Sequence, residues 1–132
     1  MKRQTVESWE NSLKILFDEI DDALEEKYGK LFPLHPSRAR RGTTSSREQD
    51  GLFNVGASFS AGFGSRYGRG YVIDIDMVTL STVPTDVREL VYNDVVIMLR
   101  TMLPERFPGR ELNVERDGRI FKIFGDLSLG EM

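Results

Sequence analysis

The feature that most constrains the fold is a strict alternation of residue types over residues 53–63. Small or apolar side chains occupy every second position there, and the alternation returns over residues 71–77 after the segment SRYGRG. A period of two is typical of a β-strand with one face against a core. Turning the chain within SRYGRG matches apolar with apolar residues, so the sequence predicts a β-hairpin that pairs Phe63 with Tyr71. A register shifted by two residues would preserve the same faces.

A second hairpin is predicted over residues 111–125. Asp117 and Gly118 suit a two-residue type I′ turn, in which both residues adopt a positive φ. This turn would pair Val114 with Phe121 and Leu112 with Ile123 on one face of the hairpin.

Two amphipathic helices are predicted, one before each hairpin. Over residues 5–28, apolar side chains recur at steps of three and four, the spacing of one helix face. The second helix is expected to begin at Pro84 and to end at Pro104, because proline suits a first turn and interrupts an interior. The two apolar faces comprise Val6, Trp9, Leu13, Leu16, Phe17, Ile20, Leu24 and Tyr28, and Val87, Leu90, Val91, Val95, Met98, Leu99 and Met102.

The order α-β-β-α-β-β most simply forms an α+β two-layer sandwich, a four-stranded antiparallel sheet with two helices on one face. The 132 residues are enough for a single domain spanning 1–132. Residues 33–51 have almost no large apolar side chains and are expected to form a flexible basic loop.

Composition excludes several classes of protein. The chain has no Cys and one His, which excludes disulfides, thiolate metal sites and His-rich zinc sites. No apolar run reaches the ~20 residues of a membrane span, and no signal-peptide pattern opens the sequence. We therefore expect a cytoplasmic protein with no membrane partner and no cofactor.

Charge is unevenly distributed along the chain. The net charge is −3, yet residues 31–70 contain six Arg and only two acidic residues. The first helix carries a cluster of acids that we expect to be solvated: Asp18, Glu19, Asp21, Asp22, Glu25 and Glu26. The arginines of the loop, Arg38, Arg40, Arg41 and Arg47, are expected to neutralise this helix rather than to bind an anion.

The segment FGSRYGRGYVIDIDM, residues 63–77, resembles the Gly-Ser and Asp-x-Asp motif of the nucleotidyltransferase superfamily. The resemblance implies that Gly64 and Ser65 hold a nucleotide phosphate and that Asp74 and Asp76 bind two Mg²⁺ ions. It also implies a third carboxylate on a later strand, for which the candidates are Glu115, Glu111 and Asp126. A small Mg²⁺-dependent nucleotidyltransferase is therefore one alternative function.

Basic and aromatic side chains at the tip of the first hairpin suggest a second alternative. Arg66 and Arg69 match phosphate groups, and Tyr67 between them could stack on a base. Together with the basic loop they would form a site for an anion, a nucleotide or a single-stranded nucleic acid.

The leading hypothesis comes from the sheet face turned away from the helices. That face would mix polar with apolar side chains, as a monomer's solvent face rarely does. It comprises Asn54, Ser58, Ser60, Asp74, Asp76, Glu111, Glu115, Val72, Val78, Leu80, Ile120 and Phe124. We expect a non-enzymatic binding or assembly module that uses this second sheet face for a protein partner or for a homo-oligomer.

Overall fold

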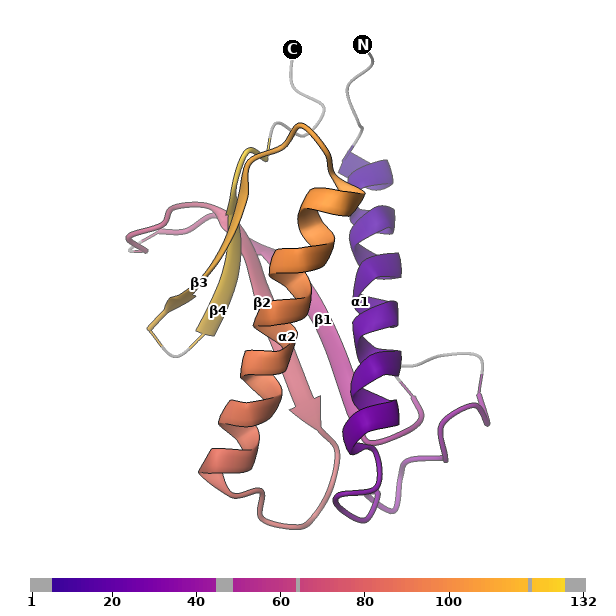
Figure 1. The fold of residues 1–132 in the computed structure, drawn as a ribbon. Helices are drawn as coiled ribbons and strands as arrows, with labels where there is room; N and C mark the ends of the chain where they lie inside the picture. Colours follow the sequence, from indigo (N-terminus) through magenta and orange to yellow (C-terminus); the bar gives the residue numbers. More distant parts are fainter. Residues whose placement is uncertain (1–5, 45–48, 64, 119, 128–132) are drawn as a thin grey trace.

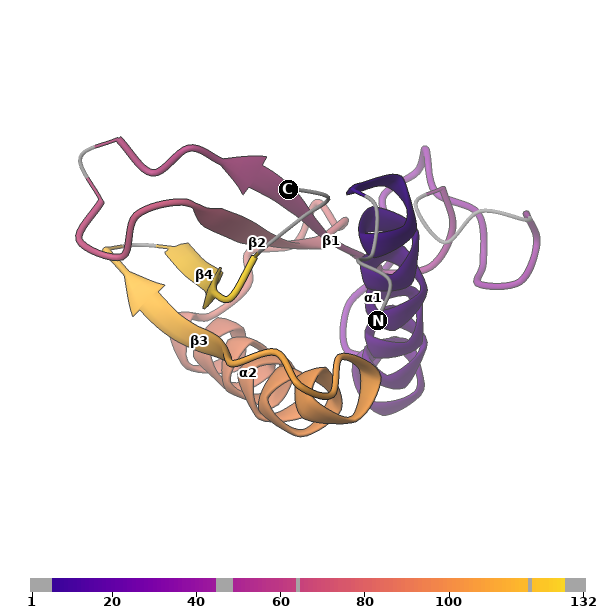
Figure 2. The same ribbon diagram turned by 90° about the horizontal axis from the view of Figure 1, so that it is seen from above.

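A computed structural model describes residues 6–44, 49–63, 65–118 and 120–127. Its elements are α1 (Val6–Tyr28), β1 (Phe53–Ser60), β2 (Gly70–Met77), α2 (Thr85–Arg106), β3 (Leu112–Asp117) and β4 (Ile120–Gly125). The strands form one antiparallel sheet in the order β1-β2-β4-β3. Both helices lie on the same side of this sheet, α1 along β1 and α2 nearer β3 (Figures 1 and 2). The predicted α+β fold is confirmed.

The core fills the space between the sheet and the two helices. The predicted apolar face of α1 is buried from Trp9 to Tyr28, and only Val6 at its start is exposed. The Trp9 ring lies 4.4 Å from the ring of Phe107, which follows α2, and so joins the two helices. In α2 the predicted face is less accurate, since Leu90 is exposed while Val96 is buried.

The register of the first hairpin differs from the prediction by four residues. Tyr71 pairs with Phe59 rather than with Phe63. An even shift leaves every side chain on its predicted face, because side chains alternate with period two. The connection is therefore longer, and it closes where the Gly62 backbone touches Gly68: a Cβ on Gly62, whose φ is +81°, would lie 2.0 Å from the Gly68 carbonyl oxygen.

The second hairpin is shifted by two residues from its predicted register. Val114 pairs with Ile123, and Asp117 pairs with Ile120, so the loop comprises residues 118 and 119 instead of the predicted Asp117 and Gly118. Gly118 has a φ of +67° at the first loop position. Residue 119 lies outside the described residues.

Helix α2 continues past its predicted end at Pro104. Pro104 lies in the last turn, where a missing N–H removes a single helical bond. The helix ends at Arg106, and the N–H of Phe107 donates to the Leu103 carbonyl at 2.9 Å. In the described part of the chain, no helix is both long and apolar enough to cross a membrane.

Shortening a core side chain of α1 tests how the helix is held. Leu16 is fully buried, whereas the neighbouring Ile15 is 58% exposed. We expect Leu16→Ala to lower the free energy of unfolding by about 2–5 kcal/mol, because it leaves a cavity. The control Ile15→Ala should change it by less than about 0.5 kcal/mol. Urea denaturation measures both, and equal effects would contradict this packing.

Candidate functional site

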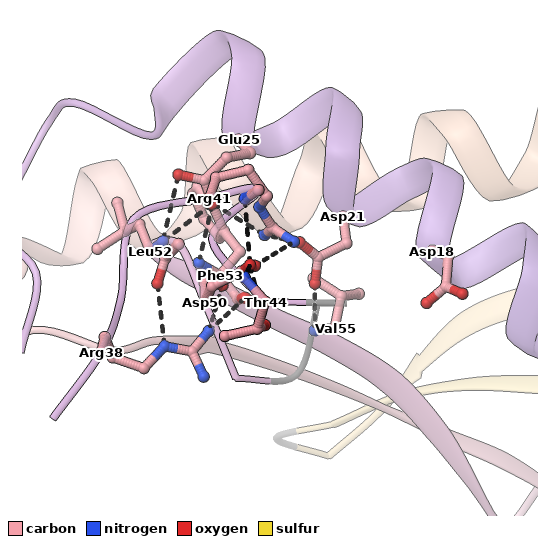
Figure 3. A network of polar contacts seen from close by, with 12 residues as sticks. Asp18, Asp21, Glu25, Arg38, Arg41, Thr44, Asp50, Leu52, Phe53 and Val55 are labelled. Atoms are coloured by element: carbon pink, nitrogen blue, oxygen red, sulfur yellow. Dashed lines mark hydrogen bonds and ion pairs between the residues drawn. The ribbon is translucent and has the colours of Figure 1, made fainter. Parts of the chain in front are cut away.

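Two carboxylates of α1 bond to the outer edge of β1, at one end of the sheet. The Asp21 carboxylate accepts the N–H of Val55 at 3.1 Å, and Glu25 accepts the N–H groups of Leu52 and Phe53 at 2.9 and 3.3 Å (Figure 3). Leu52 precedes β1, whereas the N–H groups of Phe53 and Val55 point outward, where the carbonyl groups of a neighbouring strand would otherwise accept them. Over the first part of β1, carboxylates of α1 therefore take the place that carbonyl groups of a neighbouring strand would have.

Arg41 compensates the negative charge of these carboxylates. Its guanidinium donates to Asp21 and, at 3.0 Å, to Glu25, and it lies 3.4 Å from a carboxylate oxygen of Asp50. Asp50 in turn accepts the N–H groups of Gly42 and Thr44 at 3.1 and 3.0 Å. The expectation that a loop arginine neutralises the first helix is confirmed for Arg41.

Arg38 fixes the same loop by binding carbonyl groups instead of carboxylates. It donates to the backbone oxygens of Gly51, Asp50 and Phe53 at 3.0, 2.8 and 3.1 Å. The described part of residues 33–51 is thus tied to both α1 and β1, and the flexibility of this loop stays a prediction. Arg40 is exposed, and Arg47 lies outside the described residues.

The expectation of a fully solvated acidic face on α1 is wrong for Asp21, which is 2% exposed. Burial has the largest effect on this carboxyl group and raises its pKa to about 6, although Arg41 and the Val55 N–H partly offset the rise. The pKa of Asp50 lies below its ordinary value: burial alone would raise it, but hydrogen bonds from Thr44 and Gly42 and the charge of Arg41 outweigh the effect of burial.

The second part of the β1 edge is open. The N–H of Val78 donates to the Leu52 carbonyl at 2.7 Å, so by alternation Gly56 and Ser58 bond toward β2, while Ala57 and Phe59 point outward. Among the described residues, no hydrogen bond reaches the outward N–H and C=O groups of Ala57 and Phe59.

A groove lies beside this open edge, because α1 and β1 diverge toward the N-terminal end of α1 (Figure 1). Its cavity of about 250 Å³ is lined by apolar side chains of both elements, with Phe59 at 52% exposure. The apolar lining comprises Leu13, Phe17, Val55, Ala57, Phe59 and the ring of Tyr71.

Charged side chains of α1 form one wall of the groove: Glu10, Lys14 and Asp18. The Tyr71 hydroxyl donates to Glu10 at 3.0 Å, and burial together with this bond raises the pKa of Tyr71 to about 12. Lys14 and Asp18 form an ion pair at 3.7 Å. The volume is below the ~300–1,000 Å³ usual for small-molecule sites, so the groove fits a few side chains better than a cofactor.

Ser65, which is predicted to hold phosphate, belongs to a hydrogen-bond network on the second sheet face. Lys122 is 1% exposed, and its ammonium group lies 2.9 Å from Ser65 Oγ, 2.9 Å from the Gly68 carbonyl and 3.3 Å from Asp117. Three oxygens use all three donors of an ammonium group, so Lys122 acts as a structural cation. Gly64 lies outside the described residues.

The connection between β1 and β2 therefore lies on the second sheet face. Tyr67 stacks on Phe124 with ring centroids 4.4 Å apart, and the guanidinium of Arg66 lies 4.7 Å from the Tyr67 ring. A base could stack on Tyr67 only by displacing one of these contacts. Arg69 is exposed at the end of this connection.

The carboxylates of the predicted metal site are not gathered together. Asp74 and Asp76 are exposed on one side of β2, as their spacing predicts. Glu115 lies on β3, with β4 between, and pairs with Arg100 at 3.3 Å. In the described ranges, no three His, Cys, Asp or Glu side chains are arranged to hold a metal ion. The motif resemblance itself stays a prediction.

A family model described as an uncharacterised protein matches residues 4–125. The chain belongs to this family. An uncharacterized protein of Borreliella burgdorferi is 35% identical over 117 residues, which cover 89% of this chain and 91% of the relative. No solved structure matches the chain. The range matched by the family model contains all six elements and therefore both sides of the groove.

Sequence reasoning did not find two of the residues that organise these surfaces. Lys122 lies in the apolar strand sequence IFKIF. A lysine inside such a strand is rarely buried unless its ammonium group has a bonding partner, so its position indicates a paired cation. Asp21 lies one residue after Ile20 of the apolar face of α1, close enough to be buried with it.

Removing the cation of the buried network tests its role. We expect Arg41→Met to lower the free energy of unfolding by about 3 kcal/mol, because three carboxylates lose their compensating charge. The control Arg40→Met removes an exposed arginine from the adjacent position and should be nearly neutral. Denaturant titrations of both variants would contradict the network if their losses were equal.

The raised pKa of Asp21 predicts a specific pH dependence. A carboxyl group whose pKa rises on folding favours the folded state below its unfolded pKa of 3.8, and this contribution is lost as pH rises through about 6. Between pH 4 and 7, wild type should therefore lose up to about 3 kcal/mol relative to Asp21→Asn. Asp22→Asn, on the exposed neighbouring residue, is the control. A constant difference between wild type and Asp21→Asn across this range would refute the assignment.

Proposed function

We propose that this protein is a binding module that receives an extended polypeptide segment as an added strand on the open edge of β1. The observation that carries the proposal is the outward backbone of Ala57 and Phe59, which has no partner among the described residues and borders the groove. Unpaired N–H and C=O groups at a sheet edge are a template for another strand.

The groove supports an extended ligand in particular. A strand added to β1 lies about 4.8 Å from it, and every second side chain of the added strand then faces the helix layer. Those side chains would contact Leu13, Phe17 and Phe59. Backbone bonds would supply affinity, and the groove would supply selectivity.

The open edge carries none of the usual protection against pairing. Proteins blunt exposed edges with lysine, proline, bulges or a covering element. β1 has the sequence FNVGASFS and pairs with β2 along its whole length, without charge, proline or bulge. Only its first part is capped, by Asp21 and Glu25.

The second sheet face is less suited to a partner than its sequence suggests. The described part of the β1–β2 connection covers Lys122, and the Tyr67 ring stacks on the Phe124 ring and covers one face of it. Asp74 and Asp76 keep the adjoining part of this face polar. Self-association through this face stays a prediction of the sequence, as do nucleotide and nucleic-acid binding at Arg66 and Arg69.

Removing one backbone N–H group at the edge tests the proposal. Ala57→Pro removes one outward N–H, while Ala57→Ser keeps it at nearly the same size. The probe is a displayed library of random nine-residue peptides, selected on the wild-type protein. We expect selected peptides to bind the Ser variant as they bind wild type and the Pro variant about tenfold more weakly.

Amide hydrogen exchange then locates the contact. In the free protein, the amides of Ala57 and Phe59 should exchange faster than those of Gly56 and Ser58, and a selected peptide should slow them. The proposal fails if no peptide is enriched, if Ala57→Pro binds as tightly as Ala57→Ser, or if the Ala57 and Phe59 amides are already protected without peptide. Far-UV circular dichroism verifies that both variants are folded.

A further inference from the structure

We infer that the segment bound at β1 carries basic side chains at two positions four residues apart, with a non-basic residue midway between them. This inference rests on the proposed strand addition and names the chemistry of the partner. It follows from the order of charges along the α1 wall of the groove.

The wall presents an acid, a base and an acid at regular intervals. Glu10, Lys14 and Asp18 are four residues apart and therefore lie on one side of α1, where all three line the groove. A rise of about 1.5 Å per residue separates the first from the last by about 12 Å along the helix axis.

An extended chain has a matching repeat. Side chains at positions i, i+2 and i+4 of a strand share one face, and the outer two are about 13 Å apart. Basic residues at i and i+4 would then face Glu10 and Asp18, while the residue at i+2 would face Lys14. The charge order of the wall reads the same from either end, so this pattern holds for a segment bound parallel or antiparallel to β1.

The bonds that α1 already makes to β1 support the alignment. Glu25 accepts the N–H of Phe53 and Asp21 accepts the N–H of Val55, so four residues of the helix advance two residues along the strand. The next turn brings Asp18 level with Ala57, where the open edge begins. Figure 3 shows Asp18 one turn before Asp21 on α1.

Lysine or arginine also suits the apolar lining of the groove. Their long aliphatic stems can cover an apolar surface while the charged group reaches a carboxylate. Phe17 and Phe59 would lie beneath the stems, and Glu10 and Asp18 would receive the charges.

The β1 edge of a second copy of this chain does not fit the site. Its β1, FNVGASFS, has no charged residue to meet the wall. In addition, α1 of each copy is bonded to Val55 and Leu52 of its own β1, so two paired β1 edges would run into these capped regions. The occupant that we infer is therefore an extended, basic segment of another protein.

Two peptides of identical composition test the charge order. Both are capped seven-residue chains with Thr at alternate positions; one carries Lys, Glu and Lys at the intervening positions, and the other carries Lys, Lys and Glu. Amide shifts of Ala57 and Phe59 in nuclear magnetic resonance titrations at low salt give each affinity. We expect the Lys-Glu-Lys peptide to bind about three- to tenfold more tightly, and added salt to reduce the difference.

Variants of the wall assign the preference to named residues. The double variant Glu10→Gln and Asp18→Asn should bind both peptides equally, while Ala57 and Phe59 still respond. Lys14→Glu, which alters a side chain that is 62% exposed, should instead favour a Lys-Lys-Lys peptide.

The outcomes separate this inference from the proposed function. If both peptides move the Ala57 and Phe59 amides with equal affinity in wild type, the charge pattern is wrong and strand addition stands. If neither peptide moves these amides while peptides from the random library do, the inferred chemistry is wrong. If no peptide of either kind moves them, the proposed function fails as well.

Discussion

The hydrogen bonds that backbone N–H groups of β1 donate to Asp21 and Glu25 are the interaction on which the rest of the structure depends. They bring a helix to a sheet edge by polar contact, and they bury carboxylates that need a compensating charge. Arg41 supplies that charge from the loop, and Asp50 and Arg38 fix the loop in turn. Helix, strand and loop are therefore held by one connected network.

The same contact determines where the groove forms. α1 is bonded to β1 at its C-terminal half and diverges from it at its N-terminal half (Figure 1). The apolar side chains of the diverging half still face β1, so the gap is lined by Leu13, Phe17 and Phe59. The first part of β1 is thus capped by α1, and its second part is open and borders the groove.

Periodicity in the sequence is sufficient to predict the elements, their order and, except in part of α2, their faces, because burial imposes a period of two on strands and about 3.6 on helices. It could not determine the hairpin registers, since even shifts give the same faces; the pairing of Tyr71 with Phe59 depends on how Gly62 meets Gly68. The groove depends on the angle between α1 and β1, which no local pattern encodes. Single polar residues such as Lys122 and Asp21 acquire their roles from segments distant in the chain.

The capping carboxylates also limit how far the edge can be extended. Without them, the outward donors of Phe53 and Val55 would join those of Ala57 and Phe59 in one long, uncharged edge. An exposed edge of that kind promotes stacking of sheets from many molecules into aggregates. By closing the first part of β1, α1 limits the number of backbone groups at this edge that another chain could pair with.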